Sequence, residues 1–203
     1  MAEKETTVST RQDSNFLFPV FLKLEQLSVL IVGGGYVGLE KLNAILQNSP
    51  RTKITLVATV ISEEIKQLAK NYINITLFER AYKPEDVNTV DIVIAALNDR
   101  TVSEQVQKDA KQSGKLINVA DQPELCDFYL SSIVQKGNLK IAISTNGKSP
   151  TIAKRVKEML NETLPNEMDE LLCSMQQIRN KLSGDFADKV KQLNEITKNL
   201  ASE

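Results

Sequence analysis

The sequence predicts an α/β protein with a doubly wound parallel sheet, followed by a small β-hairpin region and a C-terminal helical region. Short apolar runs alternate with helical patterns five times between about residues 27 and 120. A run of glycines lies between the first apolar run and the first helical pattern. After about residue 120 the alternation stops, and a β-prone region is followed by helical patterns. Because parallel strands need crossover connections, this alternation predicts a parallel sheet with helices on both faces.

Five short runs rich in Val, Ile and Leu are predicted to be the strands of this sheet. The first is apolar at nearly every position, which is typical of a strand buried on both faces. The predicted strands are residues 27–33, 53–58, 75–78, 91–97 and 115–120.

Signals for the start of a helix lie in two of the intervals between these runs. Ser62 is placed to cap a helix whose first turn is acidic, where the helix dipole favours negative charge. Thr101 and Glu104 match a capping box that begins the next helix, and Gly114 can end it. The sequence therefore predicts where two of the crossover helices begin.

A different pattern follows the fifth predicted strand. Residues 128–134 and 139–144 are β-prone and are joined by Lys136-Gly137-Asn138, which predicts a hairpin. Ser149 and Pro150 together mark the start of a helix, because a capping residue precedes a proline. Two more amphipathic helices are expected after Pro165, with Gly184 between them.

The composition limits the function classes. The chain has 203 residues, a formal net charge of −1, two cysteines and no histidine. That charge gives no support to nucleic-acid binding, and no apolar stretch suits a membrane span or signal peptide, so we expect neither partner. Two cysteines without a CxxC pair suit a cytoplasmic location. Without histidine, proton chemistry falls to carboxylates, Cys, Lys or Tyr, and no metal site is predicted.

The glycine run has the spacing of a dinucleotide-binding turn. Gly33-Gly34-Gly35-Tyr36-Val37-Gly38 satisfies GxGxxG between a strand and a helix. In this pattern Gly33 allows the tight turn, Gly35 lets the backbone approach a pyrophosphate, and Gly38 lets the helix pack on the strand. The sequence therefore predicts a Rossmann-like domain with a diphosphate at the helix N-terminus, and a purely structural turn is the alternative.

One part of the usual fingerprint is missing. An NAD site normally has Asp or Glu at the end of the second strand, where it binds the ribose hydroxyls. Here that strand ends Val57-Ala58-Thr59-Val60, so Thr59 and backbone groups would take this role. No nearby arginine argues for the 2′-phosphate of NADP, and the choice between the two cofactors stays open at this point.

Two further motifs, taken with the glycine turn, resemble a known family. Asn118-Val119-Ala120-Asp121 and Ser144-Thr145-Asn146-Gly147-Lys148-Ser149-Pro150 resemble the precorrin-2 dehydrogenase / sirohydrochlorin ferrochelatase family. This family includes the N-terminal half of bacterial siroheme synthase and its stand-alone homologues. The resemblance implies a homodimer that uses NAD to oxidise precorrin-2, a tetrapyrrole, to sirohydrochlorin. The chain ends without the methyltransferase half of fused siroheme synthases, so methylation is expected to come from another protein.

The resemblance also assigns site residues. Asp121 matches the catalytic aspartate and follows the fifth strand, where ligands of open α/β sheets bind; a turn cap is the alternative. Cofactor contacts are expected at Tyr36 and Val37 after the glycines, and at Thr59 and Val60 after the second strand. The residues expected to contact the substrate are Thr145, Asn146 and Lys148. By their charge, and not by the resemblance, Lys148, Lys154 and Arg155 are cations that either meet substrate carboxylates or are solvated.

The expected domain organisation combines the patterns and the resemblance. The parts are a disordered lead-in (1–14), an NAD-binding Rossmann domain (15–120), a dimerisation and hairpin region (121–149) and a C-terminal helical region (150–203).

Two other functions remain open on the sequence, and a third is disfavoured. The same site can also insert ferrous iron into sirohydrochlorin, or the chain can be a nucleotide-sensing module without catalysis. A short-chain dehydrogenase needs Tyr-x-x-x-Lys, and no tyrosine of this chain has lysine four residues later. Cys126 is interpreted as a small buried residue rather than a metal ligand.

Overall fold

The computed structural model describes residues 15–198, so the predicted lead-in, residues 1–14, lies outside the described residues. The chain divides into two compact units, the first ending at Leu130 and the second beginning at Ser131. The first unit carries the parallel sheet, and the second carries a hairpin and three helices.

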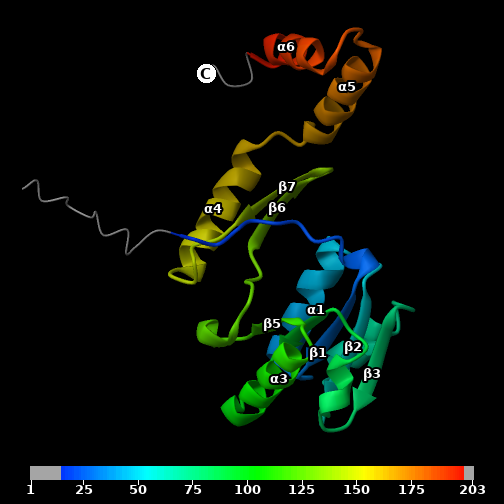
Figure 1. Cartoon of the computed structure of the whole chain (residues 1–203), viewed down its shortest axis with the longest axis vertical. Helices are drawn as coiled ribbons and strands as arrows, with labels where there is room; N and C mark the ends of the chain where they lie inside the picture. Colours follow the sequence, from blue (N-terminus) through cyan, green and yellow to red (C-terminus); the bar gives the residue numbers. More distant parts are fainter. Residues whose placement is uncertain (1–14, 199–203) are drawn as a thin grey trace, which may run out of the picture. The chain divides into compact units, whose positions relative to one another are not determined.

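The first unit is built on a five-stranded parallel sheet with the order β3-β2-β1-β4-β5 (Figure 1). Its strands are β1 (Ser28–Val32), β2 (Lys53–Ala58), β3 (Ile75–Glu79), β4 (Ile92–Ala95) and β5 (Leu116–Val119). β1 pairs with β2 on one side and with β4 on the other, so the direction of winding reverses at β1. This is the doubly wound sheet predicted from the alternation of strands and helices.

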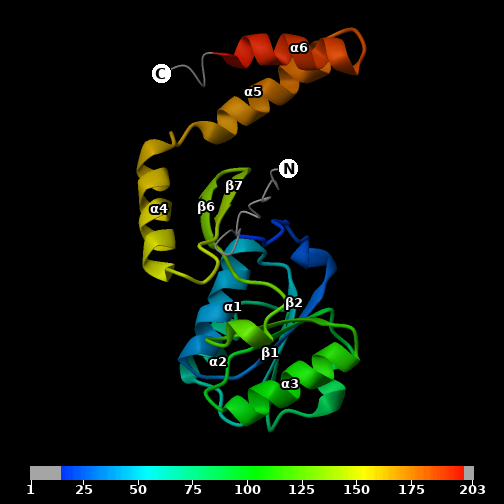
Figure 2. The ribbon, with the colours of Figure 1, turned by 60° about the vertical axis from the view of Figure 1, so that its left-hand side comes forward.

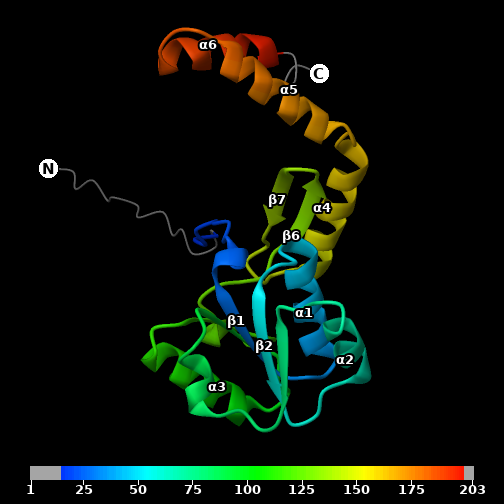
Figure 3. The same ribbon diagram turned by 90° about the vertical axis from the view of Figure 1, so that its right-hand side faces the viewer.

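Side chains of the central strands fill two cores, one on each face of the sheet. The helices of this unit are α1 (Tyr36–Asn48), α2 (Glu63–Ala69) and α3 (Arg100–Gln112). Val29 and Ile31 of β1 pack in the core under α1 and α2, whereas Leu30 and Val32 pack in the core under α3. Figure 3 shows α1 and α2 on one side of the sheet and α3 on the other. Because successive side chains point to opposite faces, a strand covered on both faces is apolar at every position.

Side-chain caps determine where α2 and α3 begin. Ser62 Oγ accepts a hydrogen bond from the Ile65 backbone N–H at 3.4 Å, as predicted. The predicted capping box at Thr101 is wrong, because the Asp99 carboxylate caps α3 by accepting from the N–H groups of Thr101 and Val102 at 2.9 and 3.2 Å. A carboxylate at this position also interacts favourably with the positive end of the helix dipole.

Gly114 ends α3, as predicted. Its φ is +66°, a left-handed conformation that costs glycine little. The Gly114 N–H donates to the Lys111 carbonyl at 3.0 Å, and the Lys115 N–H donates to the Ala110 carbonyl at 2.8 Å. These two bonds form a Schellman motif, which turns the chain from α3 into β5.

The second unit begins with the predicted hairpin. Its elements are β6 (Ser132–Lys136), β7 (Leu139–Ile143), α4 (Pro150–Thr163), α5 (Met168–Lys181) and α6 (Phe186–Thr197). α4 lies along the hairpin, where Val134 and Ala153 are buried (Figure 2). Ser149 Oγ caps α4 by accepting from the Ile152 N–H at 3.2 Å, as predicted. None of the helices within residues 15–198 is long and apolar enough to cross a bilayer.

β6 begins four residues later than predicted. The backbone before it is occupied by hydrogen bonds to β5 instead of to a neighbouring hairpin strand. The Asp127 N–H donates to the Ile117 carbonyl at 2.8 Å, and the Asn118 side-chain amide donates to the Phe128 carbonyl at 2.9 Å. These tertiary bonds hold Asp127 and Phe128 against β5, which outweighs the local β propensity at the start of the predicted strand.

Candidate functional site

The glycine turn joins β1 to α1 at the carboxyl edge of the sheet. Gly33 has φ +123°, and a Cβ atom there would lie 2.1 Å from the Ala96 carbonyl oxygen, just after β4. A Cβ atom on Gly38 would lie 2.2 Å from the Gly33 carbonyl oxygen. Both distances are far inside van der Waals contact, so a side chain at either position would force backbone apart. These two glycines allow the strand ends and the helix to meet.

Gly35 is in a different situation. Its φ of −91° suits any residue, and a Cβ atom there would meet no atom within 4 Å among the described residues. It is the N-cap residue of α1 and offers no side chain to the first-turn N–H groups, which are therefore available to a ligand. Tyr36, which is 82% exposed, and the half-buried Val37 begin the helix beside this space. Open space at a helix N-terminus fits the diphosphate of a dinucleotide.

The segment after β2 lies against the same turn. The Ser62 N–H donates to the Gly34 carbonyl at 2.9 Å, and a Cβ atom on Gly34 would lie 2.5 Å from the Val60 carbonyl oxygen. Thr59 and Val60 are both exposed. The structure thus brings the cofactor contacts predicted after β2 next to those predicted after β1.

Sequence reasoning did not single out Glu79, a carboxylate that stands beside this segment. Glu79 is the last residue of β3, and its Oε1 accepts a hydrogen bond from the Ile61 N–H at 2.9 Å. Its Oε2 lies 3.0 Å from the Lys66 Nζ. The Ile61 N–H and then Lys66 hold the pKa of Glu79 below its usual range, so this carboxyl is ionised at neutral pH. The only signal in the sequence is an acid at a strand end, and the strand order is needed to place it.

Asp121 stands at the carboxyl edge, directly after β5. The Ala120 N–H donates to the Ala95 carbonyl at 2.9 Å, which extends the pairing of β5 with β4 up to the residue before Asp121. Asp121 is exposed and has φ +58°. Within residues 15–198, no group forms a hydrogen bond or ion pair with its carboxylate. Aspartate adopts this left-handed conformation more readily than most residues, so the conformation fits both the catalytic role and the turn cap, and the role of Asp121 stays a prediction.

The Cys126 thiol stabilises the turn that contains Asp121. Its Sγ accepts from the Val119 N–H at 3.2 Å and lies 3.4 Å from the Gln122 carbonyl oxygen, to which it can donate. Burial raises the pKa of this thiol, which favours its neutral form. Cys126 therefore has a structural role, and the described part of the chain contains no group of three or more potential metal ligands.

The predicted substrate contacts lie in the second unit, in the turn between β7 and α4. Thr145 Oγ1 accepts from the Ser149 N–H at 3.2 Å and donates to the Ser149 carbonyl at 3.1 Å. The Lys148 N–H donates to the Thr145 carbonyl at 3.0 Å. The Thr145 hydroxyl is thus used to stabilise the turn. Asn146 has φ +54° and, with Asp121, is one of two non-glycine residues of positive φ in the described ranges.

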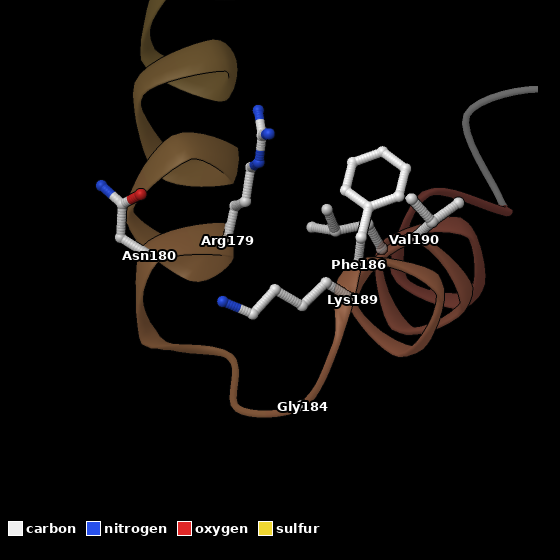
Figure 4. Close-up of a pocket in the computed structure, with 7 residues that line it drawn as sticks. Arg179, Asn180, Gly184, Phe186, Lys189 and Val190 are labelled. Atoms are coloured by element: carbon white, nitrogen blue, oxygen red, sulfur yellow. The ribbon is translucent and has the colours of Figure 1, made fainter.

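Other cations of the second unit lie on its helices. Arg155 on α4 forms an ion pair with Glu158 at 2.7 Å, whereas Lys154 is exposed. A hollow of about 590 Å³ lies between α5 and α6, where Arg179 and Lys189 reach into the space beside Phe186 (Figure 4). Phe186 is 74% exposed, and none of the predicted site residues lines this hollow. It is a surface groove between two helices.

Comparison with known proteins identifies the family. The family described as "Putative NAD(P)-binding" matches residues 20–132, which is more than half of the chain. The family "Sirohaem biosynthesis protein central" matches residues 136–163. The chain belongs to the family of siroheme synthase and precorrin-2 dehydrogenase. This confirms the resemblance carried by the glycine turn and by the motifs around Asp121 and Pro150.

Members of this family are similar to the chain over most of its length. Siroheme synthase of Vesicomyosocius okutanii is 33% identical over 87% of this chain and 35% of the relative. Siroheme synthase of Psychrobacter cryohalolentis is 36% identical over 86% of this chain and 31% of the relative. The chain thus spans about a third of the length of these curated relatives.

A solved structure extends the family likeness to the fold. The protein "SirC, precorrin-2 dehydrogenase" is similar with a TM-score of 0.69 and 28% identity, over 92% of this chain and 94% of that one. Family membership and this likeness confirm the predicted fold class and a dinucleotide of the NAD type as the cofactor. The individual cofactor, substrate and catalytic residues stay predictions.

Proposed function

We propose that this chain oxidises precorrin-2 to sirohydrochlorin with NAD as the hydride acceptor, a step of siroheme biosynthesis. The observation that carries the proposal is the likeness to SirC, precorrin-2 dehydrogenase, which extends over nearly all of both chains. The chain has both an NAD(P)-binding region and a region typical of siroheme biosynthesis proteins. A nucleotide-sensing module would need only the first.

The reaction removes two hydrogens from the substrate, one as a hydride and one as a proton. NAD, when bound, accepts the hydride. The chain holds the dinucleotide at the open space beside Gly35 and places the macrocycle at the carboxyl edge of the sheet. Asp121 is the proposed proton acceptor, because its carboxylate is exposed at that edge and is not engaged by the described residues. Asn146, Lys148 and Thr145 are proposed to contact the substrate.

Anaerobic incubation of the protein with precorrin-2 and NAD tests the proposal. We expect NADH and sirohydrochlorin to form together, each followed by its absorbance. A folded protein that binds NAD but forms neither product would refute the dehydrogenase and favour the sensing module. Repeating the reaction with ferrous or cobaltous ion tests the ferrochelatase alternative, which no feature of the described residues specifically favours.

We also propose that the protein is a homodimer formed through the hairpin. Four apolar side chains of the hairpin are only half-buried in the single chain: Ile133, Leu139, Ile141 and Ile143. Val134 is the hairpin residue that is fully buried. A two-stranded hairpin is only marginally stable by itself, so a second copy would stabilise it by covering these side chains. The cytoplasmic location stays a prediction from composition.

A further inference from the structure

Glu79 bears on which dinucleotide the site prefers. A Rossmann site for NAD normally has an acid at the end of its second strand, where the carboxylate binds the ribose and repels the 2′-phosphate of NADP. β2 has no Asp or Glu at its end, where the sequence is Ala58-Thr59-Val60. We propose that Glu79, at the end of neighbouring β3, supplies this charge and makes the site prefer NAD. The inference rests on the proposed NAD cofactor.

The sheet register brings the carboxylate to the right place. Glu79 pairs with Ala58, the last residue of β2, across the two parallel strands. Its Oε1 then accepts the Ile61 N–H at 2.9 Å, one residue beyond Thr59 and Val60. The same segment is attached to the glycine turn by the bond from the Ser62 N–H to the Gly34 carbonyl. An acid on β3 thereby occupies the neighbourhood in which a β2 acid would stand.

The local charge is unfavourable for a second phosphate. Lys66 Nζ lies 3.0 Å from Glu79 Oε2 and 3.6 Å from Glu63 Oε1. Two carboxylates and one ammonium leave this group with a net charge of −1. A 2′-phosphate carries nearly two negative charges, so it is repelled there, whereas the neutral ribose hydroxyls of NAD are not.

The adjacent arginine does not reverse this preference. Arg80 follows Glu79, and arginine is the residue that commonly accommodates the 2′-phosphate. Its guanidinium, however, donates to both oxygens of Asp86, from Nη1 at 2.8 Å and from Nη2 at 2.6 Å. It also lies 5.1 Å from the centroid of the Phe78 ring. This bidentate pair holds Arg80 away from a phosphate-binding role.

The test is Glu79→Gln, with the dissociation constants of NAD and NADP measured by calorimetry. Glutamine keeps an oxygen for the Ile61 N–H, loses the charge and releases Lys66. Removing one charge at roughly 6 Å from a doubly charged phosphate in a water-like medium corresponds to about tenfold in affinity. We expect NADP to bind about tenfold more tightly and NAD to change by less than about threefold. Adding Lys66→Gln to Glu79→Gln should remove the gain.

Glu64→Gln is the matched control, because Glu64 carries the same charge on the first turn of α2 and forms no ion pair within residues 15–198. It should leave the ratio of the two affinities nearly unchanged. A folded Glu79→Gln protein with the parental ratio, or an equal effect of Glu64→Gln, would overturn the role of Glu79 and leave the cofactor proposal standing. A folded parental protein that binds neither dinucleotide would overturn both.

Discussion

A side chain at Gly35 should abolish dinucleotide binding and leave the fold nearly intact. A Cβ atom at this position meets nothing within 4 Å in the described part of the chain, and the φ of −91° suits valine. In Gly35→Val the branched side chain would fill the space in which a diphosphate approaches the first turn of α1. Valine is a poorer N-cap than glycine, which costs α1 about 1 kcal/mol and lowers the Tm by roughly 4–8 °C.

Gly33→Ala is the comparison variant. It adds only one carbon atom, two residues before Gly35, but it should destabilise the fold. Its Cβ atom would lie 2.1 Å from the Ala96 carbonyl oxygen at a φ of +123°. Backbone strain and overpacking each cost about 1–3 kcal/mol, so we expect a loss of roughly 2–6 kcal/mol in the free energy of unfolding. For a unit of this size, that lowers the Tm by more than about 10 °C or prevents folding.

Calorimetric titration with NAD and a melting curve for each variant separate the two effects. Gly35→Val should melt no more than about 8 °C below the parental protein and bind NAD at least about a hundredfold more weakly, since the diphosphate contacts are lost. A folded Gly35→Val protein with parental NAD affinity would refute the placement of the diphosphate. Gly33→Ala with an unchanged Tm would refute the close approach of β1 and β4 described above.

Three further predictions follow from the same structure. Asp121→Asn should lower the single-turnover rate of NADH formation by about 10²–10⁴-fold, because asparagine cannot act as a base. The Tm should change little, because asparagine tolerates positive φ. If Asp121→Asn reacts as fast as the control variant Glu124→Gln, Asp121 has no part in the mechanism. Light scattering at micromolar concentration should give the mass of a dimer, and a monomer would contradict the hairpin interface. Arg80 holds the pKa of Asp86 below its usual value. The stability from this pair is therefore present above the unfolded-state pKa and is lost as the pH falls through the folded-state pKa. Arg80→Gln should lower the Tm at neutral pH, and the difference should vanish in acid.

Local patterns in the sequence were sufficient for most elements of the fold. β2 has the predicted bounds, residues 53–58, and Ser62 and Ser149 cap the predicted helices. The glycine spacing placed the turn between β1 and α1, because GxGxxG depends on contacts within a single strand–turn–helix unit. Periodicity and capping are properties of neighbouring residues, so a single sequence reveals them.

The candidate site was only partly visible in the sequence. The sequence alone showed that an aspartate follows β5. It did not reveal that Asp121 has a φ of +58° or that the Cys126 thiol stabilises its turn. Asp99, rather than Thr101, caps α3, and both lie within the same stretch of capping residues. Where several residues of similar propensity compete, the backbone geometry at the helix start decides among them.

What the sequence by itself determined is the doubly wound class, the glycine turn and the family. The tertiary structure decided which strand ends meet. Glu79 lies 46 positions after Gly33 in the chain, yet the order β3-β2-β1 and the pairing of Glu79 with Ala58 bring its carboxylate to the segment that contacts the turn. Strand order and register depend on burying both faces of the sheet through contacts between residues that are far apart in the chain. Local residue patterns therefore do not predict which strands become neighbours.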